Sequence, residues 1–355
     1  MTTRLDRFRE MLMYQRTPAI LITNEKNVTY LSGFTGDESA LLITAAQAYL
    51  ITDSRYTVQA AAEVTAFEIV EQQQGIYQKA QELAFQAQLT DISFEANDLS
   101  YAGFQQLQTV FGSINLVPTT GLVEQQREVK DQQEIELIKK AIQITDATFE
   151  YLLGYVQAGM TEANIATEME YFMRQHGATG SSFTTIVASG YRSALPHGSA
   201  SNKVIQTGDL VTFDFGCYYQ GYTSDLTRTI AVGDPGVEAK KIYQIVLEAN
   251  QAVIAASKPG VTGGQINDLA HAYVQKYGYD FGHGTGHGIG LDIHEGPGAW
   301  GHYKAQGLVA GNVVTDEPGI YLAGLGGVRI EDDLLITLTG CEVLTQAPKA
   351  ELIIL

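Results

Sequence analysis

The segment GDLVTFD at residues 208–214 returns as GNVVTDE at residues 311–317, an offset of 103 residues. Both segments fit the pattern G-[DN]-x-V-T-x-[DE], which places a carboxylate at the same position in each. A second match precedes the first in both copies, because GMT at 159–161 corresponds to GVT at 260–262, an offset of 101 residues. Two matches in the same order at nearly the same offset indicate a duplicated α/β half. Such a repeat is expected to fold as two halves about a pseudo-two-fold axis.

The duplication places acidic residues at equivalent positions. Asp214 and Glu317 end the repeated segment, so they can meet across the axis if the halves face each other. Each is followed by another acid after a glycine turn, Asp225 in the first half and Glu331 in the second. Burying four like charges together is very unfavourable unless cations compensate them. Four carboxylates and one imidazole suit two divalent ions about 3.5–4 Å apart. The neighbouring acids are interpreted as supporting or solvated carboxylates: Asp316, Asp332 and Asp333.

The glycine-rich stretch FGHGTGHGIGLDIHEGPG at 281–298 supplies the imidazoles. It contains three of the seven histidines of the chain, His283, His287 and His294. The glycines between them prevent a regular helix and let the backbone approach whatever the imidazoles hold. Because imidazole is the commonest metal ligand and titrates near neutrality, the stretch is interpreted as part of a metal-centred catalytic site. It contains no G-x-x-x-x-G-K-[ST] pattern of a phosphate-binding loop.

The N-terminal third shows short apolar runs separated by turn residues. Leu5, Phe8 and Leu12 are spaced as on one face of a helix. The apolar runs predict strands at 19–23, 39–44, 48–52, 67–70 and 92–96. Helices are expected at 56–63, 75–89 and 100–111. These elements together form an α/β unit.

A change of pattern after residue 113 marks the domain boundary. The segment 114–127 contains Pro118 and Gly121 and then becomes polar, so we expect domains at 1–125 and 126–355. A long helix is predicted from Val129 onward. Asp131 followed by Glu134 is typical of a capping box at its start.

The bulk properties exclude several classes of partner. The chain has 355 residues and a net charge of −18, whereas nucleic acids and anionic membrane surfaces need a basic footprint. The only cysteines, Cys217 and Cys341, predict no disulfide framework and suit a reducing cytoplasm. No signal peptide is recognisable, and no apolar run is long enough to span a membrane.

The second domain resembles the pita-bread metallopeptidase family, which contains methionine aminopeptidase, aminopeptidase P and prolidase. The resemblance covers roughly residues 130–355 and rests on separated motifs: ALPHG (194–198), VTFDFG (211–216), TSDLTRT (223–229), GHGTGHGIGLDIHEGP (282–297) with VVTDEPGIY (313–321), and GVRIEDD (327–333). The first domain resembles the creatinase-type N-terminal domain of aminopeptidase P and prolidase, through YLSGFTGDESALLIT and AYLITDSRYTVQA. This implies an α/β creatinase-like domain followed by a pita-bread domain, whose duplicated halves surround a curved antiparallel sheet.

The resemblance also implies roles for individual residues. The five metal ligands would be Asp214, Asp225, His287, Glu317 and Glu331. Matches to catalytic or substrate-contacting residues are His197, His283, His294 and Arg329, with Glu317 as proton shuttle. Arg329 is expected to hold Glu331 or another acid in place, and His283 to form a wall of the proline pocket. One departure from the family pattern is Asp316, where relatives carry an apolar residue.

The activity implied is that of an Xaa-Pro aminopeptidase. It would remove the residue before a proline by attack of a hydroxide that bridges two divalent metal ions, with Mn²⁺ expected and Co²⁺ or Zn²⁺ as alternatives. The nearest alternative is a prolidase, an Xaa-Pro dipeptidase that uses the same site. A more distant alternative is a non-hydrolytic creatinase-like enzyme or binding protein. Proline-containing peptides are the expected partners, and a homodimer is the expected assembly.

Overall fold

A computed structural model describes residues 3–298 and 301–355, so the first two residues of the expected N-terminal domain lie outside it. The chain divides into two compact units, residues 1–127 and 128–355. The division follows the end of helix α6 (Leu122–Arg127), so the boundary expected after residue 125 lies inside that helix. Among the helices of the described residues, none is long and apolar enough to cross a membrane.

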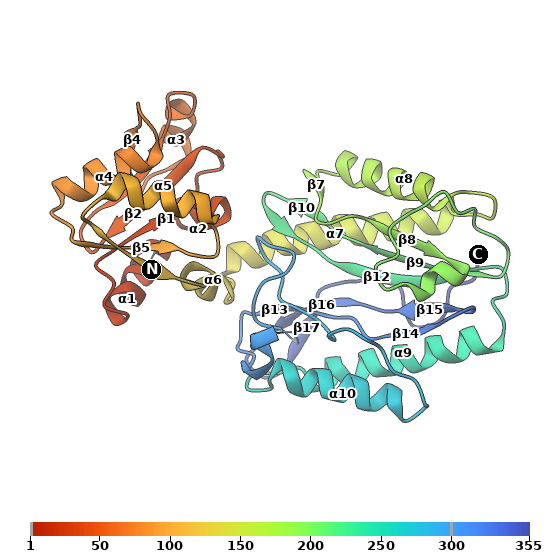
Figure 1. Ribbon diagram of the computed structural model, residues 1–355. Helices are drawn as coiled ribbons and strands as arrows, with labels where there is room; N and C mark the ends of the chain where they lie inside the picture. The colour runs from red at the N-terminus through yellow and green to blue at the C-terminus, as the bar shows by residue number, and fades with distance from the viewer. Residues whose placement is uncertain (1–2, 299–300) are drawn as a thin grey trace. The chain divides into compact units, whose positions relative to one another are not determined.

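The N-terminal unit is built on one six-stranded mixed sheet with the strand order β4-β3-β2-β1-β5-β6 (Figure 1). Strands β1 and β2 are antiparallel, whereas β1 and β5 are parallel. The strands are β1 (Ala19–Ile22), β2 (Ser39–Thr44), β3 (Ala48–Thr52), β4 (Glu68–Glu71), β5 (Asp91–Glu95) and β6 (Asn115–Thr119). The helices beside α6 are α1 (Arg4–Tyr14), α2 (Glu25–Ser32), α3 (Thr57–Glu63), α4 (Ile76–Gln86) and α5 (Tyr101–Phe111). The α/β character predicted from the apolar runs is confirmed.

Three elements of this unit were not predicted: helix α2, strand β6 and helix α6. Helix α2 lies between the strands predicted at 19–23 and 39–44, where no helix was predicted, and its start is held by a buried carboxylate from β5. Glu95 Oε2 accepts hydrogen bonds from the backbone N–H groups of Thr23 at 2.7 Å and Asn24 at 2.8 Å. Strand β6 and helix α6 lie within the segment 114–127, where the domain boundary was expected. Strand β6 contains Pro118, which a strand at the edge of a sheet accommodates because its missing N–H leaves no ladder bond unmade.

The C-terminal unit contains the two halves that the repeat predicts. The first half contains α7 (Gln132–Tyr155), α8 (Glu162–Gln175), β7 (Gly180–Ser181), β8 (Ile186–Ser189), η1 (Gly190–Ala194), β9 (Asp209–Phe215), β10 (Cys217–Tyr219), β11 (Tyr222–Thr223) and β12 (Leu226–Val232). The second contains α9 (Val237–Ala256), α10 (Gly263–Gln275), η2 (Gly301–Ala305), β13 (Val313–Asp316), β14 (Gly319–Leu322), β15 (Gly326–Arg329), β16 (Asp332–Ile336) and β17 (Cys341–Val343). Helices α8 and α10 lie at opposite edges of this unit with the strands between them (Figure 1).

Equivalent residues have the same structural roles in the two halves. Thr161 caps the N-terminus of α8 and Thr262 caps that of α10, each by accepting a backbone N–H. The preceding glycines, Gly159 and Gly260, both have positive φ angles, of 94° and 86°. The capping box of Asp131 and Glu134 at the start of α7 is also present as predicted.

Each half has its own hydrophobic core. Helices α7 and α8 pack against apolar residues of β8, β9 and β12, among them Val211, Phe213 and Leu226. Helices α9 and α10 pack against the strands of the second half, including Ile320 and Val328. One face of β9 and β12 is therefore covered by the helices of their own half, whereas Leu210 of β9 and Ala231 of β12 pack into the core of the second half.

The alternation along these strands decides where the acids lie. Successive residues of a strand point to opposite faces, so Asp214 lies on the face opposite Phe213 and Phe215. Glu331 lies between β15 and β16 and lines the cavity, whereas its neighbour Ile330 belongs to the core of the second half. The faces that carry these acids are joined across the halves, because the Glu331 N–H donates to the Thr227 carbonyl at 3.0 Å.

Candidate metal centre and active site

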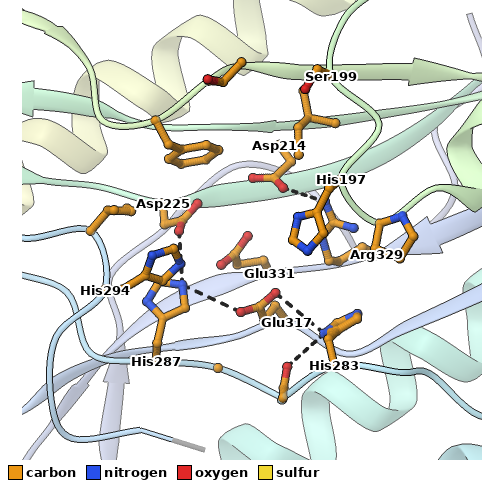
Figure 2. A pocket seen from close by; sticks show the side chains of 17 residues that line it. His197, Ser199, Asp214, Asp225, His283, His287, His294, Glu317, Arg329 and Glu331 are labelled. Carbon is orange, nitrogen blue, oxygen red and sulfur yellow. Dashed lines mark hydrogen bonds and ion pairs between the residues drawn. The ribbon is translucent and has the colours of Figure 1, made fainter. Parts of the chain in front are cut away.

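A cavity of about 680 Å³ in the C-terminal unit collects the predicted site residues. Its polar lining contains all nine of them: His197, Asp214, Asp225, His283, His287, His294, Glu317, Arg329 and Glu331. Figure 2 shows the four carboxylates turned toward a common space, with His287 beside them. An apolar part of the lining was not predicted and comprises Phe183, Ile186, Pro196 and Ile293.

Three of the five predicted ligands form a compact buried cluster. Ligand atoms of Asp225, His287 and Glu331 all lie within 4.8 Å of one another. His287 Nε2 lies 3.5 Å from Asp225 Oδ2 and 3.7 Å from Glu317 Oε1. These separations between ligand atoms are of the size that a shared cation requires, so the cluster can hold an ion with Glu317 at its edge.

Asp214 is engaged by an arginine. Arg329 Nη2 donates to Asp214 Oδ2 at 2.5 Å, and Arg329 Nε donates to Thr227 Oγ1 at 3.1 Å. The arginine therefore holds Asp214 and not Glu331. Glu331 instead accepts a hydrogen bond from Thr227 Oγ1 at 2.6 Å. Thr227 thus connects the arginine to the last acid of the cluster.

The glycine-rich stretch runs beside β13 and brings His287 to the carboxylates. The Thr315 N–H donates to the His287 carbonyl at 2.7 Å, and the Glu317 N–H donates to the Thr285 carbonyl at 2.8 Å. At Gly286 a Cβ atom would lie 2.1 Å from the Thr315 carbonyl oxygen, a distance that no other residue tolerates. Glycine at position 286 is therefore required for this close approach.

The tautomer of His287 suits a metal ligand. Its Nδ1 lies 3.2 Å from the Gly288 carbonyl oxygen, which can only accept a hydrogen bond. Nδ1 therefore carries the proton, and the lone pair of Nε2 faces Asp225 and Glu317. A backbone carbonyl that fixes the tautomer is the usual arrangement behind a metal-binding histidine.

His283 has a different environment. Nδ1 donates to the Gly284 carbonyl at 2.8 Å, so Nε2 accepts the hydroxyl proton of Tyr321 at 2.8 Å. The Tyr321 oxygen in turn accepts from Arg329 Nη1 at 2.8 Å. With both ring nitrogens engaged, His283 forms part of the wall. Tyr321 was not singled out from the sequence, although it lies within the motif that contains Glu317.

Burial sets the proton affinities of the site. Burial, followed by the charge of the neighbouring carboxylates, raises the pKa of Asp225 and that of Glu331 well above the ordinary carboxyl range. Burial also raises the pKa of Glu317. It lowers the pKa of His283 and that of His294 to about 4, so both imidazoles are neutral at neutral pH.

The donor set fits divalent cations. Among the described residues no hydrogen-bond donor reaches the buried Asp225 Oδ1, which leaves this oxygen available as a ligand. The carboxylates would repel one another as anions, and among the described residues that line the cavity Arg329 is the one arginine or lysine. Cations bound among Asp225, His287, Glu317 and Glu331, with the free oxygen of Asp214, would relieve this repulsion.

The neighbouring acids are all buried, so the alternative that they are solvated is wrong. Asp333 supports the site, because its Oδ2 accepts the Asp225 backbone N–H at 3.1 Å. Asp316 and Asp332 lie on the opposite faces of their strands and share the Asn250 side chain of α9, at 3.1 and 2.9 Å. Asp316, the departure from the family pattern, therefore points away from the cavity.

A buried ion pair supports the stretch that carries His287 and His294. Lys130 Nζ lies 2.8 Å from Glu295 Oε1, and the two side chains are 1% and 5% exposed. Glu295 also exchanges two backbone hydrogen bonds with Gly288, at 2.9 and 3.0 Å, which links the segments after His287 and after His294. The rings of His287 and His294 lie edge to face with centroids 4.3 Å apart.

We expect Lys130→Met to destabilise the protein by about 3 kcal/mol, because the substitution removes the cation that accompanies a buried carboxylate. Urea-induced unfolding measures the change. Lys139→Met is the matched control, since Lys139 pairs at 3.0 Å with Glu342 on the surface, where the side chains are 30% and 50% exposed. Its expected effect is below about 1 kcal/mol. Equal effects of the two substitutions would contradict a structural role for the buried pair.

Comparison with known proteins identifies the family of each unit. Residues 136–338 match metallopeptidase family M24, and residues 4–129 match the creatinase/prolidase N-terminal domain. The solved structure of an Xaa-Pro dipeptidase from Bacillus anthracis is 46% identical and covers 99% of both chains, with a TM-score of 0.96. The X-Pro aminopeptidase from Thermotoga maritima MSB8 is 40% identical over 99% of this chain and 100% of its own, with a TM-score of 0.90. An Xaa-Pro dipeptidase from Pyrococcus horikoshii is 36% identical over 93% of each chain.

The fold and the family matches define a metallopeptidase in which a creatinase-like N-terminal unit is followed in the sequence by a pita-bread catalytic unit. The chain belongs to metallopeptidase family M24. The fold class inferred from the repeat and from the motif resemblance is therefore confirmed, as is the assignment to the hydrolases.

Proposed function

We propose that this protein is a dinuclear metal-dependent peptidase that hydrolyses the bond between an N-terminal residue and a following proline. One observation carries the proposal: four carboxylates, the ligand tautomer of His287 and two neutral histidines line one cavity with an apolar wall. The relatives named Xaa-Pro dipeptidase and X-Pro aminopeptidase, which align over nearly the whole chain, support the choice of proline as the residue after the cleaved bond.

Metal ions held by Asp214, Asp225, His287, Glu317 and Glu331 would supply a hydroxide at neutral pH and polarise the scissile carbonyl. Mn²⁺ is our proposed ion, because carboxylates dominate the ligand set. Size-exclusion chromatography with light scattering would test the homodimer that we also propose.

The residues of this chain then divide the remaining tasks. Glu317, 3.7 Å from His287 and partly open to the cavity, accepts a proton from the attacking water and returns it to the proline nitrogen. His294 and His197 line the cavity and can donate an N–H to the oxygen that becomes negative during attack. His283 is turned toward Tyr321 and serves as a wall.

The apolar wall suits the proline ring. Phe183, Ile186, Pro196 and Ile293 belong to this part of the lining. A pyrrolidine ring buried against such side chains gains roughly 25 cal/mol per Å² of apolar surface removed from water. The wall therefore gives a physical reason for preferring proline over a polar residue at this position.

Substrate length separates the two candidate activities. We expect the purified protein, supplied with Mn²⁺, to release the first residue from Xaa-Pro-Yaa peptides, as an aminopeptidase does. The dipeptidase alternative is favoured by the names of the relatives from Bacillus anthracis and Pyrococcus horikoshii. Comparing kcat/KM for an Xaa-Pro dipeptide with that for the corresponding tripeptide distinguishes them. Cleavage of the matched Xaa-Ala peptides at an equal rate would contradict both.

A further inference from the structure

Glu162, the first residue of α8, is a buried carboxylate that does not line the catalytic cavity. It has no solvent exposure. Its Oε1 accepts hydrogen bonds from the Ser189 backbone N–H at 2.7 Å and the Ser189 hydroxyl at 2.8 Å. Its Oε2 accepts from the Ser201 N–H at 3.1 Å and the Ser201 hydroxyl at 2.7 Å, and it also pairs with Arg192. One carboxylate thus joins both ends of the segment 189–201.

This segment, which we call the His197 loop (residues 189–201), carries an imidazole of the cavity. His197 lines the cavity but is itself exposed. Within the described part of the chain, no side chain or backbone group forms a hydrogen bond with its ring. The position of the ring therefore depends on the backbone of the loop. Arg192 strengthens that backbone, since its Nη2 donates to the Ser199 carbonyl at 2.9 Å while the guanidinium also pairs with Glu162.

The duplication shows that α8 does not need this carboxylate in order to begin. The offset of 101 residues pairs Thr161 with Thr262, and both cap their helices. The same offset pairs Glu162 with Gly263, which has no side chain. The carboxylate is therefore specific to the half that contains the His197 loop. In the other half, the segment that carries His294 is held by the Lys130–Glu295 pair.

We propose that Glu162 is a positioning residue, which fixes the His197 loop and thereby sets where the His197 imidazole meets the substrate. The inference rests on the proposed peptidase function. Because Glu162 touches neither substrate nor ligands, it acts only through the loop. Its contribution to turnover should therefore depend on the presence of the His197 imidazole.

A double-mutant cycle with the full-length, Mn²⁺-loaded protein tests this dependence. Glu162→Gln keeps the shape of the side chain but turns an NH₂ group toward donors, so the loop loses acceptors. We expect kcat for an Xaa-Pro substrate to fall roughly tenfold to hundredfold, the effect of a small displacement of a catalytic group. In the His197→Ala background the same substitution should change kcat less than about twofold. Additive losses in the two backgrounds would overturn the proposal.

Two controls keep the result interpretable. Glu168→Gln lies on the same helix and removes only an acceptor of the Tyr151 hydroxyl at 2.8 Å, so its kcat should stay within about twofold of the parent. Ser201→Ala removes a hydroxyl that donates to Glu162 and accepts the Lys203 N–H at 3.1 Å, and it serves if Glu162→Gln fails to fold. Its effect on kcat should be smaller but equally dependent on His197.

Amide hydrogen exchange gives a second readout that needs no substrate. Glu162→Gln should speed exchange in residues 189–201 by about tenfold or more, while α7 keeps its protection. Unchanged exchange in the loop would overturn the inference even if the protein is an Xaa-Pro peptidase. If the parent protein cleaves no Xaa-Pro peptide, the proposed function is contradicted. Faster exchange in the His197 loop of Glu162→Gln would then still show that Glu162 fixes this loop.

Discussion

Replacing Glu317 with alanine is expected to lower kcat/KM for Xaa-Pro substrates by roughly 10⁴-fold or more, with the protein still folded. Glu317 lies between two imidazoles, with carboxylate oxygens 3.7 Å from His287 Nε2 and 4.0 Å from His283 Nδ1. The substitution removes both a proposed proton carrier and a proposed ligand. Steady-state kinetics with an Xaa-Pro peptide at saturating Mn²⁺ measures the loss.

The stability of the same variant distinguishes a functional loss from unfolding. Burial raises the pKa of Glu317, so its anion destabilises the metal-free fold at neutral pH. Metal-free Glu317→Ala should therefore unfold at a temperature equal to or above that of the parent. Glu342→Ala, with a side chain 50% exposed, is the control and should keep kcat/KM within about twofold. Parent-like turnover by Glu317→Ala would exclude this glutamate from the mechanism.

Removing the metal is expected to lower the unfolding temperature by about 10 °C at neutral pH. Saturating a site at about a thousand times its dissociation constant stabilises the folded state by roughly 4 kcal/mol. For a unit of the size of residues 128–355, which holds the site, each kcal/mol corresponds to roughly 2–4 °C. Calorimetry of chelator-treated protein, before and after addition of Mn²⁺, measures the difference.

The stabilisation of the folded protein by bound metal should grow as the pH rises above about 5. The folded-state pKa values of Asp225, Glu317 and Glu331 are raised, so the metal-free folded protein holds protons that the unfolded chain releases near pH 4. The metal-free folded protein therefore becomes less stable as the pH increases. A binding cation also displaces fewer protons from the carboxylates at higher pH. His283 and His294, with pKa values of about 4, act in the opposite direction only up to about pH 6.5. A metal-induced shift that shrinks between pH 6.5 and 8 would contradict this account.

The sequence predicted which carboxylates line the cavity because the repeat and the glycine turns locate them. The repeat identified Asp214 and Glu317, and the glycine turns led to Asp225 and Glu331. Choosing His287 among three histidines required the family motif. Backbone hydrogen bonds to β13 place His287 beside the carboxylates. They join segments that are distant in the sequence, so no local pattern indicates them.

What the sequence did not yield are interactions between distant segments. The Lys130–Glu295 pair spans 165 positions, and the Tyr321 hydroxyl joins His283 to Arg329 only after β14, β15 and the glycine-rich stretch have assembled. If the bounds of β13 and β16 had been known, the alternation of side chains would have placed Asp316 and Asp332 on the face opposite to that of Asp333. Helix α2 was missed because Val28, Thr29 and Tyr30 favour helices weakly, and packing against the sheet compensates for that preference.

Strand β9 places core residues on one face and a cavity residue on the other, which affects the substitutions that the protein tolerates during evolution. Phe213 and Asp214 are neighbours in the chain, yet one belongs to the core of its half and the other to the cavity. Substitutions that remove a ligand therefore leave the apolar packing in place, and substitutions that exchange core side chains leave the ligand set in place. Residues on the core face can therefore be exchanged during evolution while selection retains the residues on the cavity face. A descendant could thus lose or alter its chemistry without having to evolve a new scaffold.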